Sequence, residues 1–242
     1  MKDLTRRDFV SNSIVAGAAA AALPFSRVRG ANSDIRVAAV GIGGRGGGLA
    51  REFHDLDGVR LVALCDVDGR ELAKRVKEFK DRNAKVDGYE DFRRMLRDKS
   101  VDVVAVGTPD HWHVPVAAHS IVAGKDAYVE KPLSHTIAEG RYLVELARKH
   151  GKMVQHGTQA RSSENIAEGI EYLRSGKLGK VRMAKAINCQ LRGSIGRVAD
   201  SETPPNVNYD LWLGPAPKRP FNRNRFHYNW HWFWDYGTGD TG

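Results

Sequence analysis

Cysteine is scarce in this sequence. The chain has 242 residues and only two cysteines, Cys65 and Cys189. Two thiols are too few for a disulfide framework or for a zinc site built from cysteines. They could still form one bridge in an oxidising compartment, but Cys65 lies within an apolar run, which favours a small buried hydrophobic residue.

Long hydrophobic runs are also missing near the N-terminus. The apolar stretch 14–23 is too short to cross a bilayer, which takes about 20 residues, so we expect no membrane span. It follows a basic start, as in a secretion signal. The preceding "TRRDFV", with paired Arg6 and Arg7, resembles the twin-arginine export signal. We therefore predict an export signal over residues 1–31 and a periplasmic or exported protein; the alternative is an uncleaved N-terminal helix.

The charge excess is moderate once the first residues are set aside. The formal net charge is +9, and removing the five basic and two acidic residues of the first thirty leaves +6. The remaining basic residues are spread along the chain and alternate with acidic ones. This pattern favours a solvated surface over a nucleic-acid-binding face.

Short apolar runs alternate with amphipathic stretches after the signal. Near-continuous apolar strands that alternate with helices are typical of a doubly wound parallel sheet covered on both faces. Six strands are the number needed for two mononucleotide-binding halves. We therefore predict an α/β Rossmann domain over residues 32–158, with helices over 69–80 and 137–150. The predicted strands are 35–40, 60–65, 85–89, 101–106, 127–130 and 152–157.

A glycine-rich turn follows the first predicted strand. In "VGIGGRGGG", Gly41 permits a tight turn, Gly43 lets the backbone approach a pyrophosphate, and Gly46 allows close packing of helix on strand. The helix that follows presents its N–H groups to the phosphates. Gly44 and Arg45 share this turn and are predicted to bind cofactor with it. The alternative is a flexible turn without a ligand.

An acidic residue decides between these two interpretations. Asp66 ends the second predicted strand, 20 residues after Gly46, where a carboxylate can accept hydrogen bonds from ribose hydroxyls. Its charge should repel a 2′-phosphate, so NAD is favoured over NADP. Arg70 lies close in sequence and weakens that preference.

Two histidines follow the fourth predicted strand. Thr108 and Pro109 stand at the carboxyl end of this strand, on the side where open sheets bind ligands. His111 and His113 suggest a metal site, but no third ligand is near. A helix start or a cofactor contact is the favoured interpretation, and we predict no metal.

The stretch "AYVEKPLS" ends a predicted strand on two opposite charges, Glu130 and Lys131, followed by Pro132. This strand end faces the same cofactor cleft, so both side chains should emerge near the nicotinamide. A lysine there can act as a general base or proton donor. A proline in a tight turn can help to aim it. The alternative is a surface ion pair at the end of a strand.

Several of these motifs occur together. The glycine turn, "TPDHWH", "YVEKPL", "GTQAR" and "LWLGPAP" resemble the Gfo/Idh/MocA family of NAD(P)-dependent oxidoreductases over nearly everything after the signal. The resemblance implies a Rossmann domain followed by a domain on a large open sheet, which holds the substrate site and the contacts of a homo-oligomer. It also implies a sugar or glycoside as substrate.

The resemblance also implies roles for individual residues. Lys131 would be the catalytic lysine, and the Lys131–Pro132 bond would be cis. Gln159 and Arg161, in "GTQAR", would sit at the mouth of the substrate pocket. The nicotinamide side would be lined by Thr108, His113 and Glu130.

The pattern changes after residue 158. We predict an α+β domain over 159–242, with a helix over 163–176, a strand over 180–189 and a long loop over 201–225. Seven of the eleven residues 226–236 are aromatic. They should form either the edge of an aromatic core, which would need partner strands, or a wall that stacks on a sugar. In the family, a motif ending in a catalytic histidine follows "DYGTGDTG", so we expect this domain to be incomplete and the chain to bind NAD without turnover.

Three functions are compatible with these residues. The first is an NAD-dependent sugar or polyol dehydrogenase, in which Lys131 removes the hydroxyl proton. The second is a glycoside hydrolase that oxidises its substrate transiently and then returns the hydride. The third is a dinucleotide-binding module without chemistry.

Overall fold

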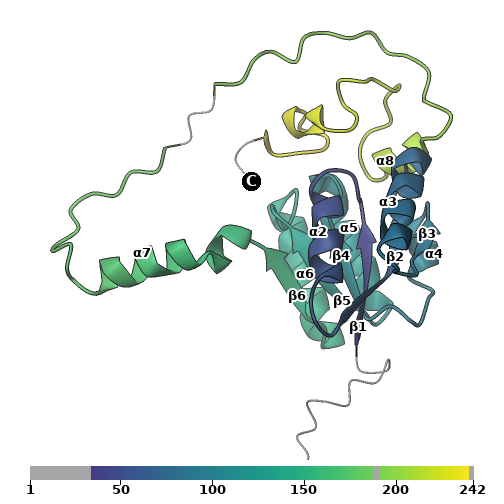
Figure 1. Cartoon of the computed structure of the whole chain (residues 1–242). Coiled ribbons are helices and arrows are strands. Elements are labelled where there is room, and N and C mark those ends of the chain that lie inside the picture. The colour runs from purple at the N-terminus through teal and green to yellow at the C-terminus, as the bar shows by residue number, and fades with distance from the viewer. Residues whose placement is uncertain (1–33, 188–190, 240–242) are drawn as a thin grey trace, which may run out of the picture. The chain divides into compact units, whose positions relative to one another are not determined.

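The computed structural model describes residues 34–187 and 191–239 (Figure 1). The predicted export signal over residues 1–31 lies outside these residues, as do the last two positions of the predicted strand 180–189. Within the described part, no helix has the length and apolar character needed to cross a membrane.

A six-stranded parallel sheet forms the centre of the fold, in the order β3-β2-β1-β4-β5-β6. This order reverses between β1 and β4, as in a doubly wound nucleotide-binding sheet. The predicted fold class is confirmed, and each of the six strands predicted for this sheet occurs with its ends moved by no more than two residues. The strands are β1 (Ile35–Val40), β2 (Val59–Cys65), β3 (Asp87–Tyr89), β4 (Val103–Val106), β5 (Asp126–Glu130) and β6 (Val154–Gly157).

Side chains of β1 alternate between two apolar layers. Val37 and Ala39 pack with the layer that includes helices α2 (Arg45–His54) and α3 (Gly69–Asp81). Ala38 and Val40 pack with the opposite layer, which includes helices α4 (Phe92–Met95), α5 (Asp110–Val122) and α6 (Ile137–His150). Both faces of the sheet are therefore covered, which explains why its strands are apolar throughout.

Two local signals set the ends of helix α6 where the sequence predicts them. Thr136 and Glu139 form a reciprocal capping box at its start. Gly151 ends it in the left-handed region with φ of 60°.

Cys65, at the end of strand β2, is a free thiol buried in the apolar layer that includes helices α4, α5 and α6. This agrees with the apolar run around it, and burial raises the pKa of this thiol.

The chain after β6 is less regular than predicted. A short 3-10 turn, η2 (Gln159–Ser162), leads into helix α7 (Glu164–Arg174), which matches the predicted helix 163–176. The predicted strand 180–189 is wrong over residues 180–187, which form no strand and are exposed. An alternating apolar pattern becomes a strand only when a neighbouring backbone pairs with it, and none does so here among the described residues.

An aromatic cluster forms the core of the C-terminal segment. Trp212, from the short helix α8 (Tyr209–Leu213), stacks on Tyr209 and contacts Tyr236, with ring centroids 5.4 and 4.8 Å apart. The expectation that these aromatics need partner strands is therefore wrong, because they pack on one another. A second 3-10 turn, η3 (Asn229–Trp232), follows in this segment. The buried members of the cluster are Val207, Tyr209, Trp212, Leu213, Phe221 and Tyr236.

The approach of helix α2 to the sheet leaves no room for a side chain at Gly46. A Cβ atom there would lie 1.7 Å from the carbonyl oxygen of Gly41. We expect Gly46→Ala to lower the free energy of unfolding by about 3 kcal/mol or more, because backbone must move to relieve the clash.

Gly48 provides a control in the same helix, because the nearest atom to its added Cβ would be an arginine nitrogen at 3.5 Å. Gly48→Ala should leave the free energy of unfolding unchanged or raise it by up to about 1 kcal/mol. Urea denaturation measures both variants, and equal stability of the two would contradict the close-packing role of Gly46.

Candidate functional site

A cavity of about 690 Å³ opens at the carboxyl ends of strands β1, β2, β4 and β5. Open α/β sheets bind ligands at this edge, where the strand order reverses. One wall comes from the turns that follow these strands, and the other comes from the C-terminal segment. That second wall contains Leu211, Trp212, His227, Tyr228, Trp230, His231, Thr238 and Gly239.

The glycine turn forms the floor of the cavity on one side. Gly41 has φ of +75°, and a Cβ there would lie 2.7 Å from the backbone of Thr108. Gly43 and Gly44 line the cavity and would have no atom within 4 Å of an added Cβ. Helix α2 starts directly after Gly44 without a side-chain cap or an acidic residue in its first turn. This helix end therefore offers N–H groups and open space to an anionic group such as a pyrophosphate.

Asp66 stands at the end of β2 with its carboxylate almost fully buried. One oxygen accepts the N–H of Ile42 and the other accepts the N–H of Asp68, each at 2.9 Å. Burial raises the pKa of Asp66, although both backbone N–H groups oppose that effect. A carboxylate has about four acceptor positions, so this one can hold the glycine turn and still accept ribose hydroxyls.

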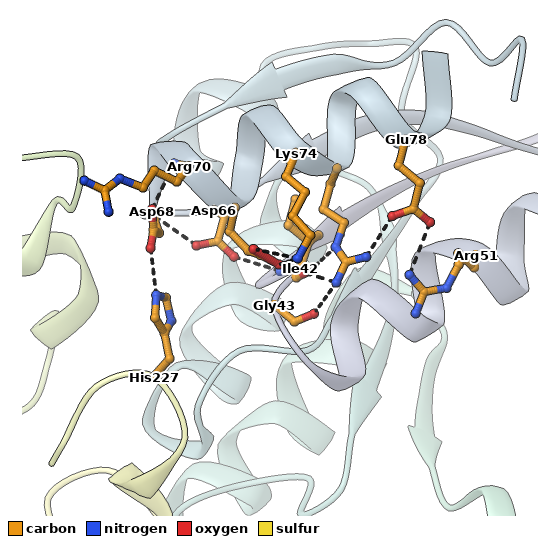
Figure 2. A network of polar contacts seen from close by, with 11 residues as sticks. Ile42, Gly43, Arg51, Asp66, Asp68, Arg70, Lys74, Glu78 and His227 are labelled. Carbon is orange, nitrogen blue, oxygen red and sulfur yellow. Dashed lines mark hydrogen bonds and ion pairs between the residues drawn. The ribbon is translucent and has the colours of Figure 1, made fainter. Parts of the chain in front are cut away.

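Asp68 joins this wall to the C-terminal segment (Figure 2). Its carboxylate contacts the Nε2 atom of His227 at 2.8 Å and accepts bonds from the Arg70 backbone and the Asn206 amide. Burial alone would raise the pKa of Asp68, but these partners bring it below its ordinary value. Asp68 is not among the site residues predicted from the sequence, although its position two residues after Asp66 is a signal for it. Nothing in the sequence marks His227.

Glu130 is paired with the glycine turn through Arg45. Its buried carboxylate lies 2.8 Å from the Nε atom of Arg45, and Arg45 also contacts Glu52 at 2.6 Å. These two acids raise the pKa of the arginine. The second oxygen of Glu130 accepts the backbone N–H of Lys131. Glu130 thus fixes both the first residue of helix α2 and the backbone that presents Lys131.

Lys131 lines the cavity, and the Lys131–Pro132 bond is cis, as the family resemblance implies. His113 holds this turn in place because its Nδ1 atom contacts the carbonyl oxygen of Pro132 at 2.6 Å. Its Nε2 atom contacts the carbonyl oxygen of Thr108 at 2.9 Å. One buried imidazole therefore joins the turns after β4 and β5.

Thr108 shows that the cavity is suited to a polar ligand. Its hydroxyl is buried and has no hydrogen-bond partner among the described residues, and the residue lines the cavity together with Pro109. A buried hydroxyl without a partner is costly, so a group that reaches it would gain a hydrogen bond. With the open glycine turn and the carboxylate of Asp66, this orphaned hydroxyl makes the cavity fit a dinucleotide.

Three predicted site residues do not line this cavity. Gln159 and Arg161 are exposed on the turn η2 and do not line this cavity. Their role at a substrate pocket stays a prediction. Gly46 is also absent from the lining, because it packs against Gly41 and Gly107 behind the turn.

Family models match most of the described chain. The model of the Gfo/Idh/MocA oxidoreductase family with the NAD-binding Rossmann fold matches residues 35–158. The chain belongs to this family. It therefore carries the family's NAD-binding domain, and NAD is its cofactor. The model of the family's C-terminal alpha/beta domain matches residues 191–242.

Individual relatives have two kinds of names. A glycosyl hydrolase family 109 protein 2 from Shewanella sp. (strain ANA-3) is 29% identical over 213 residues, which cover 77% of this chain and 46% of the relative. An alpha-N-acetylgalactosaminidase from Shewanella oneidensis is 32% identical over 144 residues, or 57% of this chain and 30% of the relative. The chain thus spans at most about half the length of these curated relatives.

A solved structure has the same fold. Scyllo-inositol dehydrogenase from Lactobacillus casei, with bound NAD(H) and scyllo-inositol, superposes with a TM-score of 0.56 at 24% identity. The match covers 60% of this chain and 42% of that one. At this identity the likeness supports the fold of this Gfo/Idh/MocA chain and nothing finer.

His111 is buried in helix α5, outside the lining of the cavity, and should make the stability of the fold sensitive to acid. Its Nε2 atom contacts the carbonyl oxygen of Trp212 at 2.9 Å, while Nδ1 is buried without a partner among the described residues. Burial lowers the pKa of His111 from 6.5 to about 4. The unfolded chain therefore takes up this proton at a higher pH than the folded chain does, and stability present above pH 6.5 is lost as the pH falls toward 4.

We expect the free energy of unfolding to drop by about 2 kcal/mol between pH 7 and pH 5 because of this one histidine. His111→Gln retains a donor for Trp212 and removes the titration, so its drop should be smaller by that amount. Urea denaturation at both pH values measures the difference. Parallel pH dependence in the two proteins would show that His111 does not titrate as its burial implies.

Proposed function

We propose that this chain forms the cofactor-binding part of an enzyme that acts on a sugar, polyol or glycoside by NAD-dependent hydride transfer. The observation that carries the proposal is the presence of Lys131 in the same cavity as the glycine turn and Asp66. A proton-transferring residue and a dinucleotide site therefore share one space.

Each part of the cavity has a separate task in this proposal. The start of helix α2, with Gly43 and Gly44, would hold the pyrophosphate, and Asp66 would hold the adenosine ribose. Thr108 would contact the nicotinamide end. When bound, NAD would supply the hydride acceptor, which leaves as NADH in a dehydrogenase and returns the hydride in a glycosidase.

Lys131 would move the proton. Its amine accepts the proton of the substrate hydroxyl in the oxidising direction and returns it in the other. Glu130 and His113 fix the backbone on either side of this lysine, as described above, so its position depends on buried partners. Rigid support of this kind keeps a general base within reach of its proton.

The opposite wall suits a sugar. Tyr228, Trp230 and His231 line the cavity and come from the aromatic segment 226–236. Aromatic rings offer an apolar face and, in tyrosine and histidine, a polar edge. Such a surface can pack against the C–H face of a sugar ring and bond its hydroxyls. This supports the sugar-stacking interpretation for these three residues, while Tyr236 belongs to the aromatic core.

Cleavage of a glycoside is the second candidate. The names of the two Shewanella relatives, a glycosyl hydrolase and an alpha-N-acetylgalactosaminidase, favour it. Oxidation of a hydroxyl two carbons away from the glycosidic carbon would acidify the C–H bond between them. Loss of that proton would expel the aglycone by elimination, and addition of water followed by return of the hydride would give the free sugar. The residues of the cavity would serve either reaction.

One assay separates the candidates. The purified protein is incubated with NAD and either free sugars and polyols or aryl glycosides, and both NADH and aglycone are measured. Net NADH from free sugars indicates a dehydrogenase. Aglycone without net NADH indicates a glycosidase. If a form of the protein as long as its curated relatives binds NAD and yields neither product, that would contradict an enzymatic function and leave a binding module.

The buried carboxylate of Asp66 should decide between NAD and NADP. Asp66→Asn keeps the shape of the side chain and removes the charge that repels a 2′-phosphate. We expect the preference for NAD over NADP to fall about tenfold or more, which calorimetric titration of both cofactors would measure. Asp81→Asn, on the exposed end of helix α3, is the control and should change neither affinity. Equal affinities for NAD and NADP in the unmutated protein would refute this role.

The ammonium group of Lys131 should serve chemistry rather than cofactor affinity. In an active form of the protein, Lys131→Met should lower turnover by about two to four orders of magnitude and change the Kd of NAD little. Lys77→Met removes an exposed lysine that pairs with Asp81 and should leave turnover unchanged. Single-turnover rates beside NAD titration test this, and near-normal turnover of Lys131→Met would remove this lysine from the mechanism.

A further inference from the structure

Arg75 holds the glycine turn from behind. It lies on helix α3, outside the lining of the cavity, and its side chain is only 12% exposed. Its Nε atom donates to the carbonyl oxygen of Ile42 at 3.1 Å, and a terminal nitrogen donates to the carbonyl oxygen of Gly43 at 3.0 Å. One guanidinium group thus binds two successive carbonyls of the turn, within the network that Figure 2 shows.

These two bonds determine where the N–H groups of the turn point. The peptide bonds after Ile42 and Gly43 are trans. In a planar trans peptide, the carbonyl oxygen and the following N–H point in opposite directions. Holding the oxygens of Ile42 and Gly43 toward helix α3 therefore turns the N–H groups of Gly43 and Gly44 away from that helix. Both glycines line the cavity, so these donors are aimed at it.

Acidic residues hold the guanidinium in this position. Glu78 accepts another Arg75 nitrogen at 2.7 Å, and Glu71 lies 3.4 Å from Arg75. Arg51, from helix α2, contacts the other oxygen of Glu78 at 3.2 Å (Figure 2). The fork of Arg75 is therefore oriented by carboxylates on its own helix before any ligand arrives.

Gly47 provides the space that this arrangement needs. A Cβ atom there would lie 2.9 Å from the guanidinium carbon of Arg75 and 2.7 Å from the carbonyl oxygen of Ile42. The glycine at this position is thus required by the carbonyl of Ile42 and by the arginine that binds it. This explains the glycine at position 47, one residue past the end of the G-x-G-x-x-G pattern.

We propose that Arg75 is a positioning residue for the pyrophosphate of NAD, acting through the peptide planes of Ile42–Gly43 and Gly43–Gly44. The proposal rests on the binding of NAD in this cavity. Lysine cannot replace arginine in this role, because a single ammonium lacks the planar fork that spans two carbonyls. The role therefore depends on the geometry of the side chain and not on its charge alone.

The experiment compares three variants of the full chain. Arg75→Lys keeps the charge and loses the fork, and Arg75→Met loses both. Arg82→Met is the matched control, because Arg82 also bridges helix α3 to the end of helix α2, through Asp55 at 3.1 Å, but does not contact the turn. Calorimetric titration with NAD, ADP-ribose and adenosine measures the affinities, and thermal unfolding measures stability.

We expect Arg75→Lys and Arg75→Met to raise the Kd of NAD and ADP-ribose about tenfold or more. The Kd of adenosine, which has no phosphate, should change less than threefold, about 0.7 kcal/mol. Arg82→Met should bind all three ligands as the unmutated chain does. A residue that only supports the fold would instead weaken adenosine and ADP-ribose alike.

Three outcomes would overturn the inference. Unchanged affinity of Arg75→Lys for NAD would show that the fork is unnecessary. Equal weakening of all three ligands, or failure of both Arg75 variants to fold, would reduce Arg75 to a structural residue. An unmutated chain that binds adenosine but neither NAD nor ADP-ribose would overturn the NAD site itself, and with it the function proposed above.

Discussion

The contact between the backbones of Gly46 and Gly41 is the constraint on which the site depends. It brings helix α2 so close to the sheet that no side chain fits between the two glycines. The start of that helix then lies at the same edge as the ends of β1, β2, β4 and β5, where the cavity opens. Because this edge carries the positive end of a helix dipole, an anion there is favoured before any side chain contributes.

Buried charges around the cavity are satisfied in ways that keep the cavity available. Asp66 bonds backbone N–H groups, Glu130 is paired with Arg45, and Asp68 is paired with His227. Each pairing joins two segments that are distant in the sequence. The hydrogen bonds that offset the cost of burying a carboxylate therefore also fix the turns near it. Arg75 does the same with a cation, because it satisfies carbonyls that point away from the cavity. The polar groups that line the cavity are thus held by partners on neighbouring turns.

The sequence predicts the sheet and the glycine turn because both depend on local patterns. Helix α6 can be predicted for the same reason, because its capping box and terminal glycine are local signals. Helix α5 was predicted only as a helix start, because it is apolar on most sides and buried in the core, so it lacks the amphipathic period of a surface helix. The strand predicted over 180–189 does not form over residues 180–187, because a strand requires pairing with a neighbour and not only the pattern of one segment. The contact of Asp68 with His227 joins residues 159 positions apart, and a single sequence contains no signal for such a pair.

Both walls of the cavity are anchored to the start of helix α5. On the nucleotide side, His113 binds the turns after β4 and β5. On the other side, the backbone N–H of His111 donates to the carbonyl oxygen of Tyr236, and the indole N–H of Trp112 donates to that of Trp212. The carboxylate of Asp110 accepts the backbone N–H of Thr238. Four successive residues, Asp110 to His113, therefore hold a turn of the sheet edge and the aromatic segment in register. Since we propose that the cofactor contacts the first wall and the substrate the second, this one helical turn would fix the spacing between the two walls. The two histidines of "TPDHWH" therefore have a structural role here: their contacts with carbonyl oxygens hold the two walls of the cavity.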